Sequence, residues 1–400
     1  MKERVVIGLS GGVDSSVAAY RLVEQGYDVV ALFMKNWHDT TGLLEADCPY
    51  DDDVMFAEMV ARKLGIPFHR VDLSVPYRKR VVDYMFSEYK KGRTPNPDVL
   101  CNREIKFESF VTEAKALGAD FVATGHYCRK EVLSLPGGDV YRLLAGADKN
   151  KDQSYFLCQV TQEQLKEALF PIGDIDKPEV RRIAKELGLA TAERKDSQGI
   201  CFVGKVDLPT FLQQELKAKT GRTVEVPVSG DMYYSIEGGL PGADINSDRL
   251  ESLSSPYNYN PASGKTVGKH QGAHFFTIGQ RKGINIGGYK EPLFVIANDV
   301  DKNIVYVGEG HNHPGLYRKG LFIRNDEIHW IRPNMELQPD ETVDYMVRIR
   351  YRQPLEKARL YKRYNGLYIL FENAQRGVAP GQFAAWYDGD ELIGSGVIDG

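Results

Sequence analysis

The first two hundred residues alternate short apolar runs with longer segments in which apolar residues recur every three or four positions. The apolar runs predict buried strands at 5–9, 29–34, 68–73 and 121–124. The segments 14–26, 52–65 and 103–118 begin with polar residues and end on glycine, as capped helices do. Two more helices are expected at 177–189 and 207–221. This alternation predicts a doubly wound α/β domain with a parallel sheet.

The second half of the chain has a different pattern. The helical period fades from about residue 222, and residues 229–264 are rich in Gly, Ser, Pro, Asn and Asp. We expect a long loop or insertion there. Short β-branched and aromatic runs then predict antiparallel strands at 274–279, 293–300, 303–310, 321–330, 341–351, 357–372 and 382–398. The predicted domains are α/β at 1–205, a mixed central domain at 206–310, and a C-terminal β-barrel at 311–400.

Composition narrows the class of protein. Hydrophobic residues make up 42% and charged residues 26% of the 400, which is typical of a soluble globular chain. The longest apolar run, 29–34, is too short to cross a membrane, and the N-terminus lacks a signal-peptide core. We therefore expect a cytoplasmic protein with no membrane partner. The five cysteines include no C-x-x-C pair, so we expect neither a disulfide framework nor a ribbon-type zinc site.

The motif "GLSGGVDSS" follows the first predicted strand and opens a helix. The paired glycines let an anion approach the backbone, where N–H groups and the helix dipole attract it. Ser10 and Ser15 can add hydroxyl donors, and Asp14 suits a partner of magnesium or bound water. The lysine of a Walker A loop is absent, and the "GKT" at 264–266 lacks the first glycine because Tyr259 stands there. The motif resembles the PP-loop of enzymes that use ATP to adenylate a carbonyl oxygen and release pyrophosphate.

Two cysteines stand in polar surroundings. Cys101 ends a proline-rich loop at a predicted helix start, with basic residues in the next turns, so a lowered thiol pKa is expected. Asp98, three residues earlier, is a candidate proton acceptor. Cys201 follows a basic pair and Gly199. One cysteine could carry sulfur as a persulfide and the other could resolve it, although each alone is more often a core residue.

Further motifs carry a closer resemblance. "GRTPNPDVLCN", "ATGHY", "KDQSYFL", "GICF", "HQGAHFFTIGQRKG" and "RYRQP" occur in this order along nearly the whole chain. They are similar to those of the bacterial tRNA-specific 2-thiouridylases, which replace the C2 oxygen of the wobble uridine in tRNAs for Lys, Glu and Gln with sulfur. The resemblance implies a PP-loop fold of the adenine nucleotide alpha hydrolase type, ATP with Mg²⁺, and a persulfide donor, either a cysteine desulfurase or a sulfur-relay protein. The segment 229–264 is longer than the family pattern and has no assigned role.

The resemblance also assigns site residues. It implies catalytic roles for Asp98 as general base or orienting residue, Cys201 as persulfide carrier and Cys101 as partner thiol. ATP would contact Gly8, Leu9, Ser10, Gly11, Gly12, Val13, Asp14 and Ser15, with Met34 and Gly125 at the adenine and ribose. The target base would meet Asn96, Pro97 and Asp98. Other tRNA contacts would be His126, Lys151, Asp152, Gln153, Arg350, Tyr351 and Gln382.

Local charge supports an RNA partner although the net charge is −4. Residues 345–365 hold seven Lys and Arg against one acid, with tyrosines between them. Arg348, Arg350 and Arg352 would share one face of a strand and contact phosphates, or form only a solvated basic face. "HNH" at 311–313 is more simply a turn than a metal site. Two other functions stay open: an amide-forming adenylating synthetase, which would not need both cysteines, and an RNA-binding module without chemistry.

Overall fold

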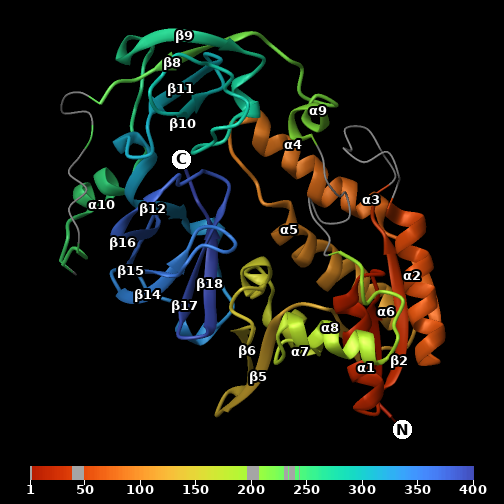
Figure 1. Ribbon diagram of the computed structural model, residues 1–400. Coiled ribbons are helices and arrows are strands. Elements are labelled where there is room, and N and C mark those ends of the chain that lie inside the picture. The colour runs from red at the N-terminus through yellow and green to blue at the C-terminus, as the bar shows by residue number, and fades with distance from the viewer. Residues whose placement is uncertain (1, 38–48, 196–206, 229–232, 234–238, 243) are drawn as a thin grey trace.

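The computed structural model describes residues 2–37, 49–195, 207–228, 233, 239–242 and 244–400. Its first sheet is parallel, in the order β3-β2-β1-β4-β7 (Figure 1). The strands are β1 (Arg4–Gly8), β2 (Asp28–Lys35), β3 (Phe68–Asp72), β4 (Phe121–Ala123) and β7 (Ala168–Leu169). The predicted doubly wound α/β fold is therefore confirmed, with one short strand, β7, that the sequence pattern did not show.

Helices cover both faces of this sheet because successive strand residues point to opposite sides. Val5 and Ile7 of β1 pack against α1 (Val13–Glu24), α2 (Pro49–Leu64) and α8 (Lys177–Glu186). Val6 packs on the other side, where the helical segments run through 74–90 and 97–116. These segments are α3 (Ser74–Tyr77), η1 (Arg78–Val82), α4 (Asp83–Lys90), α5 (Pro97–Leu100), η2 (Cys101–Ser109) and α6 (Phe110–Ala116).

A central sheet has the order β10-β11-β8-β9. Its strands are β8 (Gly221–Glu225), β9 (Lys265–His270), β10 (Leu293–Asp299) and β11 (Ile304–Glu309). Two predictions fail here. The helix expected over 207–221 is only α9 (Leu208–Leu212); turns follow it, and the chain is already in strand β8 at Gly221. The strand expected over 274–279 is replaced by a short 3₁₀ turn, Ala273–Phe275, where His274 and Phe275 pack edge to face.

The third sheet combines distant parts of the chain. Its order is β12-β16-β15-β14-β17-β18-β6-β5, with β13 paired to β18. The C-terminal strands are β12 (Tyr317–Arg324), β13 (Ile328–Trp330), β14 (Thr342–Arg348), β15 (Glu356–Arg363), β16 (Gly366–Arg376), β17 (Phe383–Asp388) and β18 (Glu391–Val397). The hairpin of β5 (Cys128–Leu135) and β6 (Gly138–Ala145) joins them through the register Leu143–Leu392. Residues of the first domain thus extend the C-terminal sheet.

The predicted insertion is not wholly a loop. Residues 247–254 form α10 (Ser247–Ser254), with the Asn246 side chain accepting from the N–H of Arg249 as an N-cap. Leu250 and Leu253 pack on Tyr361, Tyr368 and Leu370 of the C-terminal sheet. Composition hid this helix because its Leu residues are spaced for burial against a partner that lies far away in sequence.

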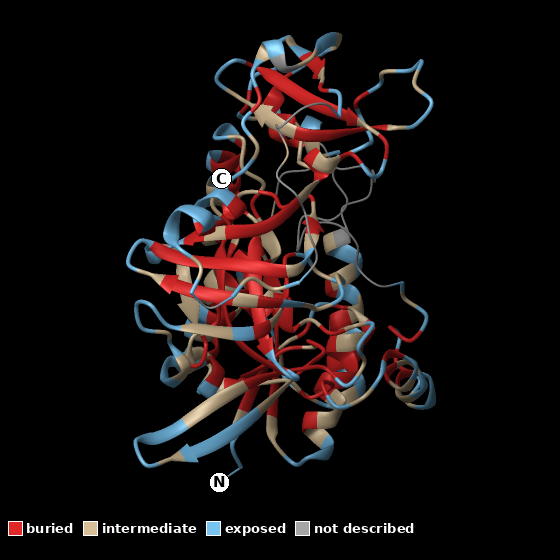
Figure 2. Ribbon diagram, turned by 90° about the vertical axis from the view of Figure 1, so that its left-hand side faces the viewer, coloured by how far each residue is buried: buried red, intermediate tan, exposed pale blue. Residues whose placement is uncertain are grey.

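Buried residues form a continuous interior in each layer, whereas the tip of the β5–β6 hairpin is exposed (Figure 2). Within the described part of the chain, none of the helices has the length and apolar character that a bilayer crossing requires.

Candidate active site

The turn between β1 and α1 is held by its own hydroxyl groups. Ser15 Oγ lies 3.1 Å from Ser10 Oγ and donates to Gly12 O at 3.1 Å. Gly11 has a φ of +76°, and a Cβ there would lie 2.3 Å from Asp53 O of α2. Arg194 donates to Gly11 O at 2.8 Å and forms an ion pair with Asp53. Burial raises the pKa of Asp53, although the Arg194 guanidinium acts to lower it. Glycine is therefore required where the loop packs on α2.

Asp14 has a partner that sequence reasoning missed. Lys177 Nζ lies 2.7 Å and 2.9 Å from the two carboxylate oxygens of Asp14, and Tyr127 donates its hydroxyl to Oδ1 at 2.6 Å. Lys177 is the first residue of α8 and is nearly buried. The Lys177 ammonium group thus lies beside the turn between β1 and α1, although Lys177 follows Asp14 by 163 residues in the sequence.

Gly125 and Met34, which the resemblance assigns to the adenine and ribose, both lie next to this turn. A Cβ on Gly125 would approach Ser15 N to 2.8 Å, so this position tolerates no side chain. The Met34 methyl group packs over Gly8, at 3.4 Å from the position of a Cβ there. Both contacts leave β1 and its turn flanked by the ends of β2 and β4.

The helix that carries Asp98 and Cys101 begins earlier than predicted. Its N-cap is Asn96, whose side chain accepts from Val99 N at 3.3 Å, and the helical run Pro97–Ala116 continues through a π-helical segment. Asn102 donates to Asp98 O at 3.0 Å and to Phe156 O at 3.2 Å, which fixes this turn. Asp98 is half-buried.

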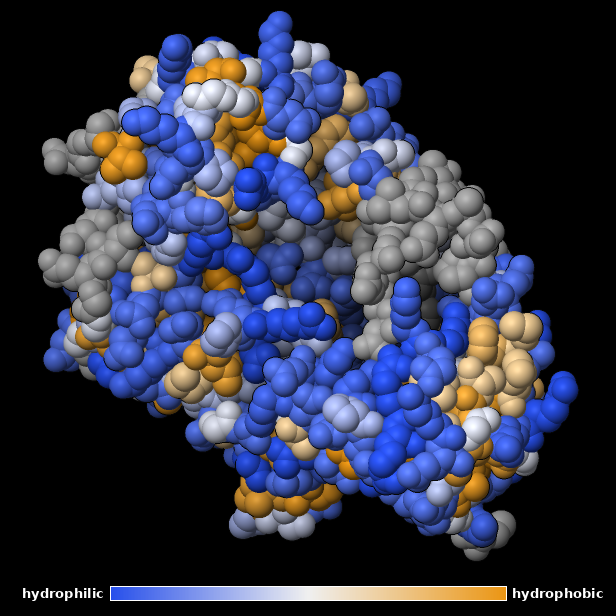
Figure 3. All heavy atoms as spheres, in the orientation of Figure 1, coloured by the Kyte–Doolittle hydropathy of each residue, from blue (hydrophilic) through white to orange (hydrophobic). Residues whose placement is uncertain are grey.

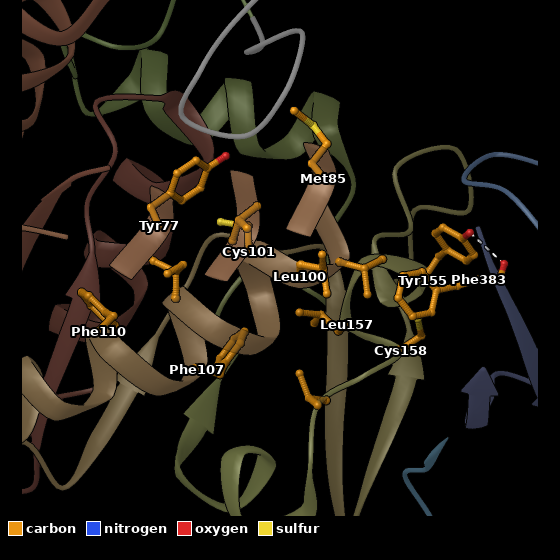
Figure 4. Packing of buried hydrophobic residues seen from close by; sticks show 14 of the residues in the cluster. Tyr77, Met85, Leu100, Cys101, Phe107, Phe110, Tyr155, Leu157, Cys158 and Phe383 are labelled. Carbon is orange, nitrogen blue, oxygen red and sulfur yellow. Dashed lines mark hydrogen bonds between the residues drawn. The ribbon is translucent and has the colours of Figure 1, made fainter. Parts of the chain in front are cut away.

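Cys101 is fully buried in this structure, which differs from the polar-loop position predicted for it. It lies beside Tyr77 and Leu100 in the large core cluster (Figure 4). The reason is the early helix start, which turns Cys101 toward the interior. Cys201 lies outside the described residues.

His126 is buried behind the turn rather than on the surface. Its Nδ1 lies 2.7 Å from Thr124 Oγ1 and its Nε2 lies 3.4 Å from Lys106 Nζ. Since an ammonium only donates, Nε2 is the acceptor and Nδ1 carries the proton. Burial and then the charge of Lys106 hold the pKa of His126 well below its usual value. This histidine connects the helix of Cys101 to the end of β4.

The segment 151–153 combines one buried residue with two half-buried ones. Asp152 is buried; Oδ1 accepts from Gly146 N and Ser154 N at 3.1 Å, and Oδ2 lies 3.2 Å from Arg348 Nη2. Gln153 accepts from Tyr127 N at 3.0 Å. Asp152 and Gln153 therefore hold the backbone around this segment in place.

The predicted arginine face is wrong in one respect. β14 ends at Arg348, which is buried over the ring of Tyr387, and Arg352 has a φ of +63° in a turn. The three arginines therefore do not alternate along a strand. Arg350 is exposed and donates to Arg376 O and Gly377 O, while Tyr351 packs on Phe156.

The "HNH" segment is a turn. His313 accepts from Gly315 N at 3.1 Å, and its Nε2 bonds to Val226 O at 2.9 Å. Nowhere in the described ranges do three or more His, Cys, Asp and Glu side chains gather as a metal site would require.

Figure 3 shows the face of the molecule hollowed at its centre, with mainly hydrophilic residues around the hollow.

Comparisons with known proteins settle the family. A family model described as "tRNA methyl transferase HUP domain" matches residues 3–205; a PRC-barrel model matches 257–309, and an "Aminomethyltransferase beta-barrel domain" model matches 321–398. A tRNA-specific 2-thiouridylase of Christiangramia forsetii is 58% identical, covering 99% of this chain and all of the relative. The chain belongs to the tRNA-specific 2-thiouridylase family. Relatives of the same name from Flavobacterium johnsoniae (58% identical; 99% of this chain, 100% of the relative) and Halalkalibacterium halodurans (44%; 99% and 94%) agree.

Proposed function

We propose that this chain is an ATP-dependent tRNA 2-thiouridylase that replaces the C2 oxygen of the wobble uridine with sulfur in tRNAs for Lys, Glu and Gln. The observation that carries the proposal is 58% identity, over 99% of the chain, to a relative named for this activity. The anion-binding turn beside Lys177 supports it independently. We also propose three domains, at 1–205, 206–310 and 311–400, and the cytoplasm as the compartment.

The first step would use ATP. The uridine C2 oxygen attacks the α-phosphorus, and pyrophosphate leaves. Gly8, Leu9, Ser10, Gly11, Gly12, Val13, Asp14 and Ser15 would surround the phosphates, with Met34 and Gly125 at the adenine and ribose. Asp14 would offer the hard oxygen ligands that Mg²⁺ prefers, after its carboxylate releases the Lys177 ammonium that contacts both oxygens in this structure. Mg²⁺ would neutralise phosphate charge when bound.

The second step would transfer sulfur. The terminal sulfur of a persulfide on Cys201 attacks C2, and AMP leaves with the former C2 oxygen. Cys101, which is fully buried in this structure, would have to reach Cys201 for the next step. Its thiolate attacks Cys201 Sγ, so the Sγ–S bond breaks and its electron pair stays with the sulfur on the base. A Cys101–Cys201 disulfide remains, and an external dithiol reduces it. Asp98 would accept or orient the proton near the target base.

The tRNA contacts are proposals of unequal support. Asn96, Pro97 and Asp98 are half-buried at the start of the helix and could meet the base. Lys151, Arg350 and Tyr351 are half-buried or exposed, which favours direct contact. His126 and Asp152 are buried and would act from below the surface, whereas Gln153 is half-buried like Lys151. A cysteine desulfurase or a sulfur-relay protein would supply the persulfide.

Mass analysis of the wobble nucleoside tests the proposal. After incubation with ATP, tRNA and a persulfide source, we expect uridine to gain the mass difference between sulfur and oxygen. Cys101→Ser and Cys201→Ser should each abolish that gain. An amide-forming synthetase would keep its ATP-dependent reaction in both variants, and a binding module would release no pyrophosphate at all.

A further inference from the structure

The loop that would meet the target base has an unusual bonding requirement. In "RTPNPD", Pro95 and Pro97 have no N–H, so the loop has carbonyl acceptors but few donors for pairing within itself. Its carbonyls must find donors elsewhere, because unpaired backbone groups are costly when partly buried. The donor comes from the C-terminal domain.

Gln382 supplies that donor with its side-chain amide. Nε2 donates to Thr94 O at 3.0 Å and to Pro95 O at 3.2 Å, while Oε1 accepts from Asn96 Nδ2 at 3.5 Å. Two carbonyl acceptors on one side fix the orientation of the amide. The amide nitrogen and oxygen of Gln382 thus form hydrogen bonds with three consecutive loop residues.

The turn that carries Gln382 is itself tied to the loop. Thr94 N donates to Pro380 O at 2.7 Å. Gly381 has a φ of +89°, and a Cβ there would lie 3.0 Å from both Thr94 N and Thr94 O. Behind the turn, Tyr155 donates to Phe383 O at 3.0 Å (Figure 4). Only glycine allows this close approach of the two backbones.

Two further elements hold the same loop. Arg93 lies between Glu88 and Asp399, at 2.7 Å and 2.8 Å from their carboxylate oxygens. On the central domain, Asn298 donates to Gly92 O at 3.3 Å and Thr277 Oγ1 lies 3.1 Å from Thr94 Oγ1. All three parts of the chain therefore meet at residues 92–96.

We propose that Gln382 is a positioning residue for the base-binding loop, and that the Arg93–Asp399 ion pair assists it. The reaction that this positioning would serve is tRNA thiolation, so the inference rests on the proposed function. Docking of the C-terminal domain sets the place of Asn96 and, one residue beyond Pro97, of Asp98. Misplacement by about 1 Å can reduce a rate by about a hundredfold, so we expect the loop's anchors to control turnover.

The test compares Gln382→Ala with a matched control, Gln162→Ala. Gln162 has the same bonding pattern: Nε2 donates to Tyr141 O and Ile331 O, and Oε1 accepts from Tyr141 N, but it joins α7 (Gln162–Glu167) to other strands. For each variant we would measure kcat and KM for tRNA thiolation, tRNA Kd, and amide hydrogen exchange of the peptide 92–100. Asp399→Asn, at the half-buried chain end, serves as a second variant.

Gln382→Ala should lower kcat at saturating tRNA by about tenfold or more and speed exchange of the peptide 92–100, an exchange that a residue touching only tRNA would not alter. Asp399→Asn should do the same to a smaller extent, and Gln162→Ala should change neither kcat nor that exchange. A raised tRNA Kd with normal kcat and unchanged exchange would overturn the inference. If the wild type made no 2-thiouridine, the proposed function would fail, while the exchange measurement would still decide the role of Gln382.

Discussion

Replacing Lys177 with methionine separates the roles of the Asp14–Lys177 ion pair in folding and in catalysis. Lys177 is 8% exposed and contacts both carboxylate oxygens of Asp14, whose side chain is 32% exposed. Removing one partner of a fully buried pair costs about 3–5 kcal/mol. Because water reaches Asp14, we expect a smaller loss of unfolding free energy, about 1–2 kcal/mol.

The effect on the reaction should be larger. Loss of one preorganised charge facing a developing negative charge reduces a rate by about a hundredfold to a thousandfold, or about 3–4 kcal/mol. The assay is tRNA-dependent pyrophosphate release at saturating ATP, alongside urea unfolding. Lys319→Met is the control, since Lys319 is also buried but donates to Gly239 O and Glu372 O. Pyrophosphate release at the wild-type rate in Lys177→Met would refute the reasoning.

Three more variants test other parts of the account. His126→Gln should flatten the loss of stability as pH falls below 6.5, because the folded pKa is lowered and the unfolded state takes up the proton first; the slope removed is at most about 1.4 kcal/mol per pH unit in a urea titration, and an unchanged slope would mean that His126 is protonated when folded. Leu253→Ala should destabilise the C-terminal sheet by about 2–3 kcal/mol in urea, unless α10 is dispensable. Arg350→Ala should weaken tRNA binding and lower its salt dependence by about one counterion; an unaltered slope would leave Arg350 without a phosphate contact.

The sequence pattern predicted the first sheet well because its strands are short runs buried on both faces. Val29–Met34, for example, lies inside the observed β2. The residue types of the turn also allowed the anion-binding loop to be predicted, since Gly11 and Gly12 lie between a strand and a helix. Features that depend on residues close together in the chain could therefore be predicted from the sequence.

Features that depend on contacts between residues far apart in the sequence could not be predicted. The hairpin 128–145 pairs with β18, some 250 residues later, and no local pattern shows that partner. Lys177 reaches Asp14 across 163 residues, and Gln382 reaches Thr94 across 288. The helix α10 forms because Leu250 and Leu253 find a sheet to cover, although its surroundings have the composition of a loop. Arg348 was misassigned because the end of β14 depends on burial beside Asp152.

The central claim is that the wobble C2 oxygen leaves on AMP while sulfur takes its place. A tRNA substrate labelled with heavy oxygen at C2 of that uridine tests it most directly. After reaction with ATP and a persulfide source, the account predicts that the heavy isotope is found in the phosphate of AMP and that the base carries sulfur. Heavy oxygen retained in the tRNA, or found in pyrophosphate, would contradict it.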